Sequence, residues 1–327
     1  MTKAPLPEAR GPLSTAVRDV LLGRPAPAAG PGVEDADPLG EDLQLALYLT
    51  YEPHYRSMEG VADEREWDPA LLGLRRPMEA AFLAALRAAV PHDGDVTAAL
   101  EPLLVDPVDG RGVSRWLMDQ GDWERMREYL VHRSLYQLKE SDPQAWLIPR
   151  LEGQAKASLA AVEYDEFGAG HGERVHARLF AELMEGAGLD ASYGRYVDLV
   201  PAPAVAAVNM MTMFGLHRAL RGAGVGNFAA QEIASPPGAR RMVKALERLG
   251  AQDRCVLFFS EHVEADAVHE QVMRRFVLDD LLAREPELAP DVAFGIRATR
   301  WLDDLWENHV LGAWDAGRTS LRRPVRL

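Results

Sequence analysis

Three residues of types that commonly bind metal ions lie close together in the segment SEHVEADAVHEQVM, residues 260–273: His262, Asp266 and His269. A helix turns by about 100° per residue, so steps of four and then three residues return to nearly the same bearing. The three side chains would then lie within roughly 60° of arc. Their neighbours include alanines and valines typical of a buried surface. The spacing predicts a helix that directs two imidazoles and one carboxylate toward a common metal site.

A second group of ligand types occurs in EYDEFGAGHGERVHARLF, residues 163–180, where Glu166, Glu173 and His176 are spaced seven and then three residues apart. On one continuous helix they would share a face about 80° wide. A glutamate and a histidine three residues apart form the pair that ferritin-like bundles use at dinuclear centres. Since a lone helix cannot complete a metal site, we predict that this segment packs beside residues 260–273.

Two further carboxylates, Glu140 in YQLKESDP and Glu232 in NFAAQEIASPP, stand in otherwise apolar or turn segments. With Glu166, Glu173 and Asp266 they would make five buried acids. Burying five carboxylates without compensation would be very unfavourable or would force them to take up protons. Two divalent cations would supply four positive charges against these five negative charges, and they would give the histidines a role as neutral ligands. The charge balance favours a dinuclear site over a mononuclear one.

Three glycines, Gly168, Gly170 and Gly172, separate Glu166 from the rest of its group. Each costs roughly 0.8–1 kcal/mol relative to alanine inside a helix. Two interpretations stay open: a helix that becomes ordered only when metal binds, or a helix that ends near Phe167 and is followed by a short loop and a new helix that begins near Gly172. A phosphate-binding loop is disfavoured because no strand precedes the glycines.

The elements that must position these residues are predicted to be helices. From Asp42 onward, apolar residues recur at three- and four-residue steps, as in RRPMEAAFLAALRAAV and WERMREYLVHRSLYQL. Gly, Pro or Asp residues separate the segments, as in ESDPQ and ASPPGAR, and alternating strand patterns are missing. The sequence therefore predicts an all-α fold. We expect an irregular arm with at most one short helix at 1–40, an accessory helical region at 41–110, the main domain at 111–320 and a basic, solvated tail at 321–327.

The amino-acid composition disfavours several classes of binding partner and cellular location. The net charge of −14 over 327 residues disfavours nucleic acid and anionic membranes, because both require a basic surface. No apolar run approaches the ~20 residues of a membrane span, and the N-terminal segment lacks the apolar part of a signal peptide. The single cysteine, Cys255, excludes an internal disulfide. These features predict a soluble, cytoplasmic protein.

The combined ligand pattern resembles that of the haem-oxygenase-like diiron oxidases and oxygenases, and more narrowly that of the bacterial iron-containing redox enzymes. The residues that carry the resemblance are Glu140, Glu166, Glu173, His176, Glu232, His262, Asp266 and His269. It covers about residues 125–320 and includes HRSLYQLKESDPQAWLIPRL and EHVEADAVHEQV. It implies a haem-oxygenase-like bundle of about seven core helices, two irons per chain without haem, and activation of O2 as co-substrate through a peroxo-diiron(III) species.

The resemblance also implies a distribution of ligands. One iron would be bound mainly by His176, Glu173 and His269, with Glu140 nearby. The other would be bound mainly by His262, Asp266 and Glu232, with one carboxylate bridging the two. Glu166 matches an additional carboxylate found in relatives that oxygenate nitrogen, and we assign it the role of favouring the ferric state. Glu166 and Glu173 are thus the expected catalytic carboxylates.

The family acts on small molecules of specialised metabolism. The resemblance therefore implies an amino acid or amine-bearing substrate that undergoes N-oxygenation, desaturation or oxidative C–H or C–C cleavage. Arg150 or Arg178 could bind a substrate carboxylate, although solvated arginines would look the same. Met210, Met211, Met213 and Phe214 could line a cavity or pack in the core.

An external electron donor is expected, because the sequence has no cysteine set for an iron–sulfur cluster and no Rossmann fingerprint. Residues 1–110 could form an accessory layer, a lid over the pocket or the surface of a homodimer. Three other functions stay open. Haem binding would need a pocket poor in carboxylates. A metal-dependent hydrolase could use His92-Asp93, which here lies in the turn-like sequence PHDGD. A helical interaction protein without catalysis would leave the alignment of ligand types unexplained.

Overall fold

The computed structural model describes residues 2–25, 32–106 and 110–325, with the side chains at 264, 266 and 267 outside that description. Helices account for the regular structure of these residues, and an isolated bridge between Ala4 and Met58 is the only strand-like pairing among them. The α-helices are α1 Pro12–Leu21, α2 Glu41–Tyr51, α3 Pro69–Ala89, α4 Val96–Leu100, α5 Val113–Gln120, α6 Trp123–Gln137, α7 Asp142–Ala145, α8 Gly153–Glu166, α9 His176–Gly186, α10 Ala202–Leu216, α11 Arg221–Arg248, α12 Asp253–Val272, α13 Asp279–Arg284 and α14 Ala289–Asp315. The predicted all-α class is confirmed.

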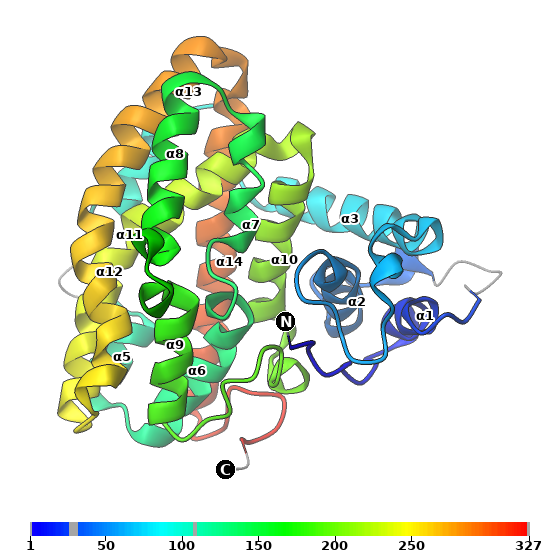
Figure 1. Cartoon of the computed structure of the whole chain (residues 1–327), viewed down its shortest axis with the longest axis horizontal. Coiled ribbons are helices and arrows are strands. Elements are labelled where there is room, and N and C mark those ends of the chain that lie inside the picture. The colour runs from blue at the N-terminus through cyan, green and yellow to red at the C-terminus, as the bar shows by residue number, and fades with distance from the viewer. Residues whose placement is uncertain (1, 26–31, 107–109, 326–327) are drawn as a thin grey trace.

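The long helices form one bundle in which α11 packs between α12 and α14, and α12 also contacts α8 and α9 (Figure 1). The approach of α11 to α14 depends on glycine, because a Cβ added at Gly226 would lie 2.1 Å from the Val292 carbonyl oxygen. One added at Gly295 would lie 2.0 Å from the Ala223 carbonyl oxygen. Only the missing side chains allow the two backbones to come so close.

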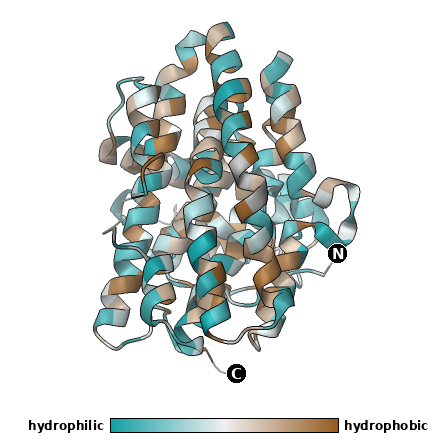
Figure 2. Cartoon of the chain, turned by 90° about the vertical axis from the view of Figure 1, so that its left-hand side faces the viewer, coloured by the Kyte–Doolittle hydropathy of each residue, from teal (hydrophilic) through white to brown (hydrophobic). Residues whose placement is uncertain are grey.

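Figure 2 shows hydrophilic and hydrophobic residues mixed along each ribbon on one side of the molecule, whereas α10 is buried over most of its length. The apolar side chains gather in a main core that includes Leu130, Phe180 and Phe258. A smaller core around Leu159 and Phe228 lies where α8 meets α11 and α13. Burial of this apolar surface fixes which face of each helix turns inward, and so fixes the positions of the polar residues on that face.

The described residues before α5 form a packed layer against the bundle, with α2 beside α10 (Figure 1). The amide nitrogen of Asn209 on α10 donates to the backbone and side-chain oxygens of Gln44 on α2, both at 2.8 Å. Further along, the hydroxyls of Tyr55 and Thr212 lie 2.8 Å apart. Residues 1–40, predicted to be irregular apart from one short helix, contain α1 within this layer. The layer is therefore an integral part of the fold.

Two sequence expectations need correction. The segment ASPPGAR was predicted to separate helices, but α11 continues through Pro236 and Pro237. Pro236 has no N–H to bond the carbonyl of Glu232 four residues before it, so the cost is a lost hydrogen bond rather than the end of the helix. The basic tail, predicted to be solvated, begins packed: Leu321 is buried and the Nε of Arg322 lies 3.3 Å from Glu41. Among the described residues, no helix combines the length and apolarity needed to cross a bilayer.

Candidate metal centre

Two groups of buried histidine and carboxylate side chains converge between α8, α9, α11 and α12. We call them site A, made of Glu140, Glu166, His176 and His262, and site B, made of Glu166, Glu232 and His269. Within each site the candidate ligand atoms all lie within 4.8 Å of one another. Because Glu166 belongs to both sites, it is a candidate bridge between two metal positions.

Five separate segments supply these side chains. Glu140 lies in the turn after α6, Glu166 ends α8 and His176 begins α9. Glu232 comes from α11, and α12 contributes both His262 and His269. The two α12 histidines are held in register by an unbroken helix of 20 residues, which passes into a π-helix at Met273–Leu278 just after the second of them. The centre thus depends on helix packing as much as on any local motif.

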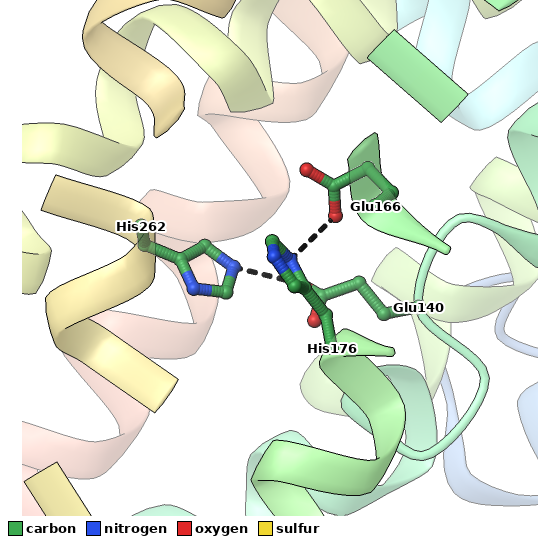
Figure 3. A group of neighbouring side chains, drawn as sticks. All are labelled: Glu140, Glu166, His176 and His262. Atoms are coloured by element: carbon green, nitrogen blue, oxygen red, sulfur yellow. Dashed lines mark ion pairs between the residues drawn. The ribbon is translucent and has the colours of Figure 1, made fainter. Parts of the chain in front are cut away.

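Site A is shown in Figure 3, where the side chains of Glu166 and Glu140 approach His176 and His262. The Nδ1 of His176 lies 2.8 Å from the Oε2 of Glu166, and the Nε2 of His262 lies 3.4 Å from the Oε1 of Glu140. The short His176 contact is poorly directed for a hydrogen bond, and its Nδ1 and the Oε2 of Glu140 are buried without a hydrogen-bond partner. Buried polar atoms are normally paired, so this nitrogen and this carboxylate oxygen are suited to coordinate a metal ion.

The ring of His262 is oriented by its own helix. Its Nδ1 lies 2.7 Å from the carbonyl oxygen of Phe258, one turn earlier in α12. A carbonyl can only accept, so Nδ1 carries the proton and the lone pair is on Nε2, the atom that faces site A. Metal-binding histidines are commonly fixed by such a hydrogen bond from the second ring nitrogen. His262 is therefore prepared to bind a metal through Nε2.

In site B both nitrogens of His269 are engaged. Its Nδ1 lies 3.0 Å from the Oε2 of Glu232 and 3.5 Å from the Oε1 of Glu166. On the other side, its Nε2 lies 3.3 Å from the Oδ2 of half-exposed Asp165. A proton on Nε2 that is donated to Asp165 would leave the Nδ1 lone pair directed at the two glutamates. Asp165 was not among the residues predicted from the sequence.

Electrostatics support a negative charge on Glu166. Burial raises the pKa of its carboxyl, but the short contact with His176 and the nearby His262 and His269 outweigh this and hold the pKa below its ordinary value. Its two oxygens point to different sites, Oε2 toward His176 and Oε1 toward His269. An ionised carboxylate that presents one oxygen to each site has the form needed to bridge two cations.

A second buried acid on α8, Glu163, was also missed by the sequence reasoning. Burial, followed by the charges of Glu166, Glu232 and Asp142, raises its pKa to about 9. Neither of its oxygens has a hydrogen-bond partner. The signal was present in EYDEF, where Glu163 precedes Glu166 by three residues and so shares its helix face. The end of α8 therefore holds two buried carboxylates of opposite protonation tendency.

Glu173 does not reach the centre, which corrects its prediction as a ligand and catalytic group. The side chain of Glu173 is 71% exposed, and its ion-pair contact is with exposed His171 at 3.6 Å. The glycine segment ends α8 and forms two short turns, with Gly168 and Gly170 in the left-handed region, before α9 begins at His176. Glu173 and His176 therefore do not share a helix, and the predicted three-residue pair is not formed.

Of the other predicted ligands, Glu140, Glu166, His176, Glu232, His262 and His269 are brought together. Asp266 lies on α12 between the two histidines, but its side chain is outside the described residues, so its assignment stays a prediction. The interpretation of the glycines as a helix that ends and a loop that follows agrees with the structure. The new helix starts later than expected, at His176.

A cavity of about 360 Å³ opens onto Glu140, Glu166, Glu232 and His262. All four residues Met210, Met211, Met213 and Phe214 belong to the apolar core, and Met210 and Met211 also contribute to the cavity wall. The two arginines predicted as carboxylate anchors do not line it. Arg150 donates to the Leu216 carbonyl oxygen, and exposed Arg178 pairs with Glu182.

The helical bundle with buried imidazole and carboxylate donors has the architecture of a metal-dependent redox protein, and its nitrogen and oxygen ligands suit iron. The family model described as iron-containing redox enzyme matches residues 127–304, more than half of the chain. The chain therefore belongs to this family, within the haem-oxygenase-like superfamily, as the ligand pattern predicted. No curated protein matches it. Membership identifies an iron-dependent oxidoreductase.

Proposed function

We propose that this protein is a non-haem diiron oxidase or oxygenase that uses O2 to oxidise an amino acid or an amine-bearing small molecule. The observation that carries the proposal is the position of Glu166, whose two oxygens face two separate groups of buried ligands. A mononuclear site would need only one of these groups. Family membership supports iron as the metal.

The residues fit two iron ions in donor type and in charge. Glu140, Glu166 and Glu232 supply three negative charges, and the predicted ligand Asp266 would supply a fourth. Since Glu173 is outside the centre, these four acids would balance the four positive charges of two ferrous ions. Such a pair of ions would supply two electrons to O2. An external electron donor remains part of the proposal.

The protein's own residues prepare this chemistry by orientation. The Phe258 carbonyl fixes the tautomer of His262, and Asp165 holds the outer nitrogen of His269. Apolar side chains shield the centre: the ring of Phe258 packs 4.4 Å from the ring of His262, measured between centroids. Apolar packing on this side of pre-oriented ligands limits the access of water to the reacting groups from that side. The cavity beside Glu166 gives a small molecule access from the other side.

The proposal is tested by anaerobic loading with ferrous iron, followed by exposure to O2 with and without a panel of amino acids. We expect two irons per chain, a spin-coupled iron pair in the Mössbauer spectrum after oxidation, and a visible-region transient whose decay one amino acid accelerates. Glu166→Gln should bind less iron and lose the spin coupling. Glu173→Gln, a glutamate of the same segment outside the centre, is the matched control. One iron per chain without spin coupling in the unaltered protein would exclude a diiron enzyme.

A further inference from the structure

The far end of the cavity has a different character from the metal end. Its wall is built from one face of α6, with Tyr129 and Arg133, and one face of α14, with Asp303, Trp306 and Glu307. The spacings of four on α6, and of three and four on α14, place each set on a single helix face. We call the group Arg133, Asp303 and Trp306 the polar wall.

The polar wall contains two N–H donors without acceptors. Among the described residues, Arg133 makes neither a hydrogen bond nor an ion pair; its guanidinium lies over the ring of Trp306, 5.5 Å from the centroid. The Nε of Arg133 and the indole Nε1 of Trp306 are both buried without a hydrogen-bond partner. Buried donors are rarely left unpaired in folded proteins. A guanidinium and an indole N–H side by side indicate a place for an anionic oxygen ligand, most simply a carboxylate.

The polar wall also contains an acidic side chain, that of Asp303. The carboxyl of Asp303 is accessible within the cavity and forms no ion pair or hydrogen bond with another described residue. Although the residue is exposed within the cavity, desolvation by the surrounding protein raises its pKa to about 6, opposed by the nearby charge of Arg133. The second acid on this face, Glu307, already accepts a hydrogen bond of 3.1 Å from the backbone of Val113. Asp303 is therefore the acid of this wall that is free to bind a cationic group.

The polar wall is separated from the metal ligands along the cavity. Arg133 lies four residues before Gln137, the last residue of α6, which is roughly 6 Å along the helix axis, and Glu140 follows in the turn after α6. A molecule held at the polar wall by two charged groups would therefore have to extend a chain of several bonds before it reached sites A and B. Gln137, midway between Arg133 and Glu140, lines the intervening part of the cavity.

We propose that the polar wall binds the zwitterionic head group of an α-amino acid, with the carboxylate on Arg133 and Trp306 and the ammonium on Asp303. The side chain of the amino acid, rather than its α-nitrogen, then lies at the metal sites. This inference rests on the proposed function only for the consequence that the side chain is the part to be oxidised. The head-group site itself does not depend on iron.

The test is binding of the proteinogenic L-amino acids to the full-length protein, measured by calorimetry both without metal and after ferrous loading under anaerobic conditions. The tightest binder is then compared with its decarboxylated amine and with its deaminated acid. We expect each analogue to bind about tenfold or more weakly, because each lacks one charge-assisted hydrogen-bonding group.

Variants assign the two contacts. Arg133→Met should lower the affinity for the amino acid by about tenfold or more and leave the affinity for the decarboxylated amine unaltered. Asp303→Asn should lower the affinity for the amino acid but not the affinity for the deaminated acid. Trp306→Phe, which keeps the ring and removes the N–H, is a milder variant in case Arg133→Met does not fold. Arg178→Met, a surface arginine, is the control.

The inference would be wrong if no amino acid bound. It would also be wrong if Arg133→Met lowered the affinities for the decarboxylated amine and for the deaminated acid equally. Failure of the proposed function has a different signature, because it concerns iron stoichiometry and coupling while head-group binding is measured without metal.

Discussion

Lys139 and Glu140 are consecutive residues, both buried, yet they belong to two charged clusters with opposite properties. The first cluster is complete in itself: Lys139 forms an ion pair with Glu52, and the hydroxyl of Tyr193 donates to the other oxygen of Glu52 at 2.7 Å. The ammonium also lies 3.9 Å from the centre of the Tyr55 ring. The second cluster, the metal centre, leaves Glu140 and His176 with unpaired atoms.

The presence or absence of partners within the protein distinguishes buried charges that stabilise the fold from buried charges that are suited to bind a ligand. A buried ion that has its full set of partners in the protein needs nothing further. Buried polar atoms that have no hydrogen-bond partner destabilise the folded state unless a bound ion or molecule pairs with them. By this criterion the Lys139–Glu52 pair ties the N-terminal layer to the bundle, and sites A and B are groups that could hold a metal ion.

The largest effect should come from breaking the complete cluster. Lys139→Met leaves Glu52 buried without its countercharge, and we expect a loss of about 3–5 kcal/mol in the free energy of unfolding. Urea denaturation of the metal-free protein measures it. The double variant Lys139→Met, Glu52→Gln should recover part of the loss, because it removes the unpaired charge.

The neighbouring substitution sharpens the contrast. Glu140→Gln should change the stability of the metal-free protein by less than about 1 kcal/mol and should lower iron binding. If Lys139→Met and Glu140→Gln destabilised the metal-free protein equally, the distinction between the two clusters would be lost.

Glu163→Gln should stabilise the metal-free protein by roughly 3 kcal/mol at pH 7. Burial raises the folded-state pKa of Glu163 to about 9, whereas the unfolded chain releases this proton near the ordinary value. The folded state is then the one that keeps the proton, so stability falls as the pH rises between these two values. Gln removes this dependence. Denaturation at pH 5.5 and pH 8, with exposed Glu185→Gln as the control, should show a gain that grows with pH.

Asp165→Asn should weaken iron binding by about 10–100-fold and leave the fold intact, because Asp165 only orients His269. Competition with a chelator measures the affinity. If the affinity were unaltered, the contact between Asp165 and His269 would have no part in metal binding.

The smallest effect is expected for Glu173→Gln. Since the Glu173 side chain is mostly exposed, its substitution should alter stability by no more than about 0.5 kcal/mol and leave iron stoichiometry unaltered. Iron analysis and thermal denaturation check both. A loss of iron would mean that the glycine segment rearranges to bring Glu173 into the centre when metal binds.

Much of the candidate site could be predicted because it depends on helical periodicity. His262 and His269 lie on one unbroken helix, where spacing alone decides that they share a face. Glu173 was assigned wrongly because the same rule was applied across glycines, where the helix ends. Arg133 was missed because a lone arginine in an amphipathic helix carries no local sign of whether its guanidinium faces solvent or a cavity.

The sequence by itself determined the all-helical class, the family, and the helix that carries the two imidazoles, since each follows from residue types at fixed local spacing. Only the tertiary structure decided that Glu166 rather than Glu173 joins two ligand groups, that Glu163 is buried beside them, and that Arg133 and Asp303 face the same cavity. These facts depend on which residues far apart in the chain become neighbours. Packing of the apolar helix faces sets those distances, and no single segment encodes them.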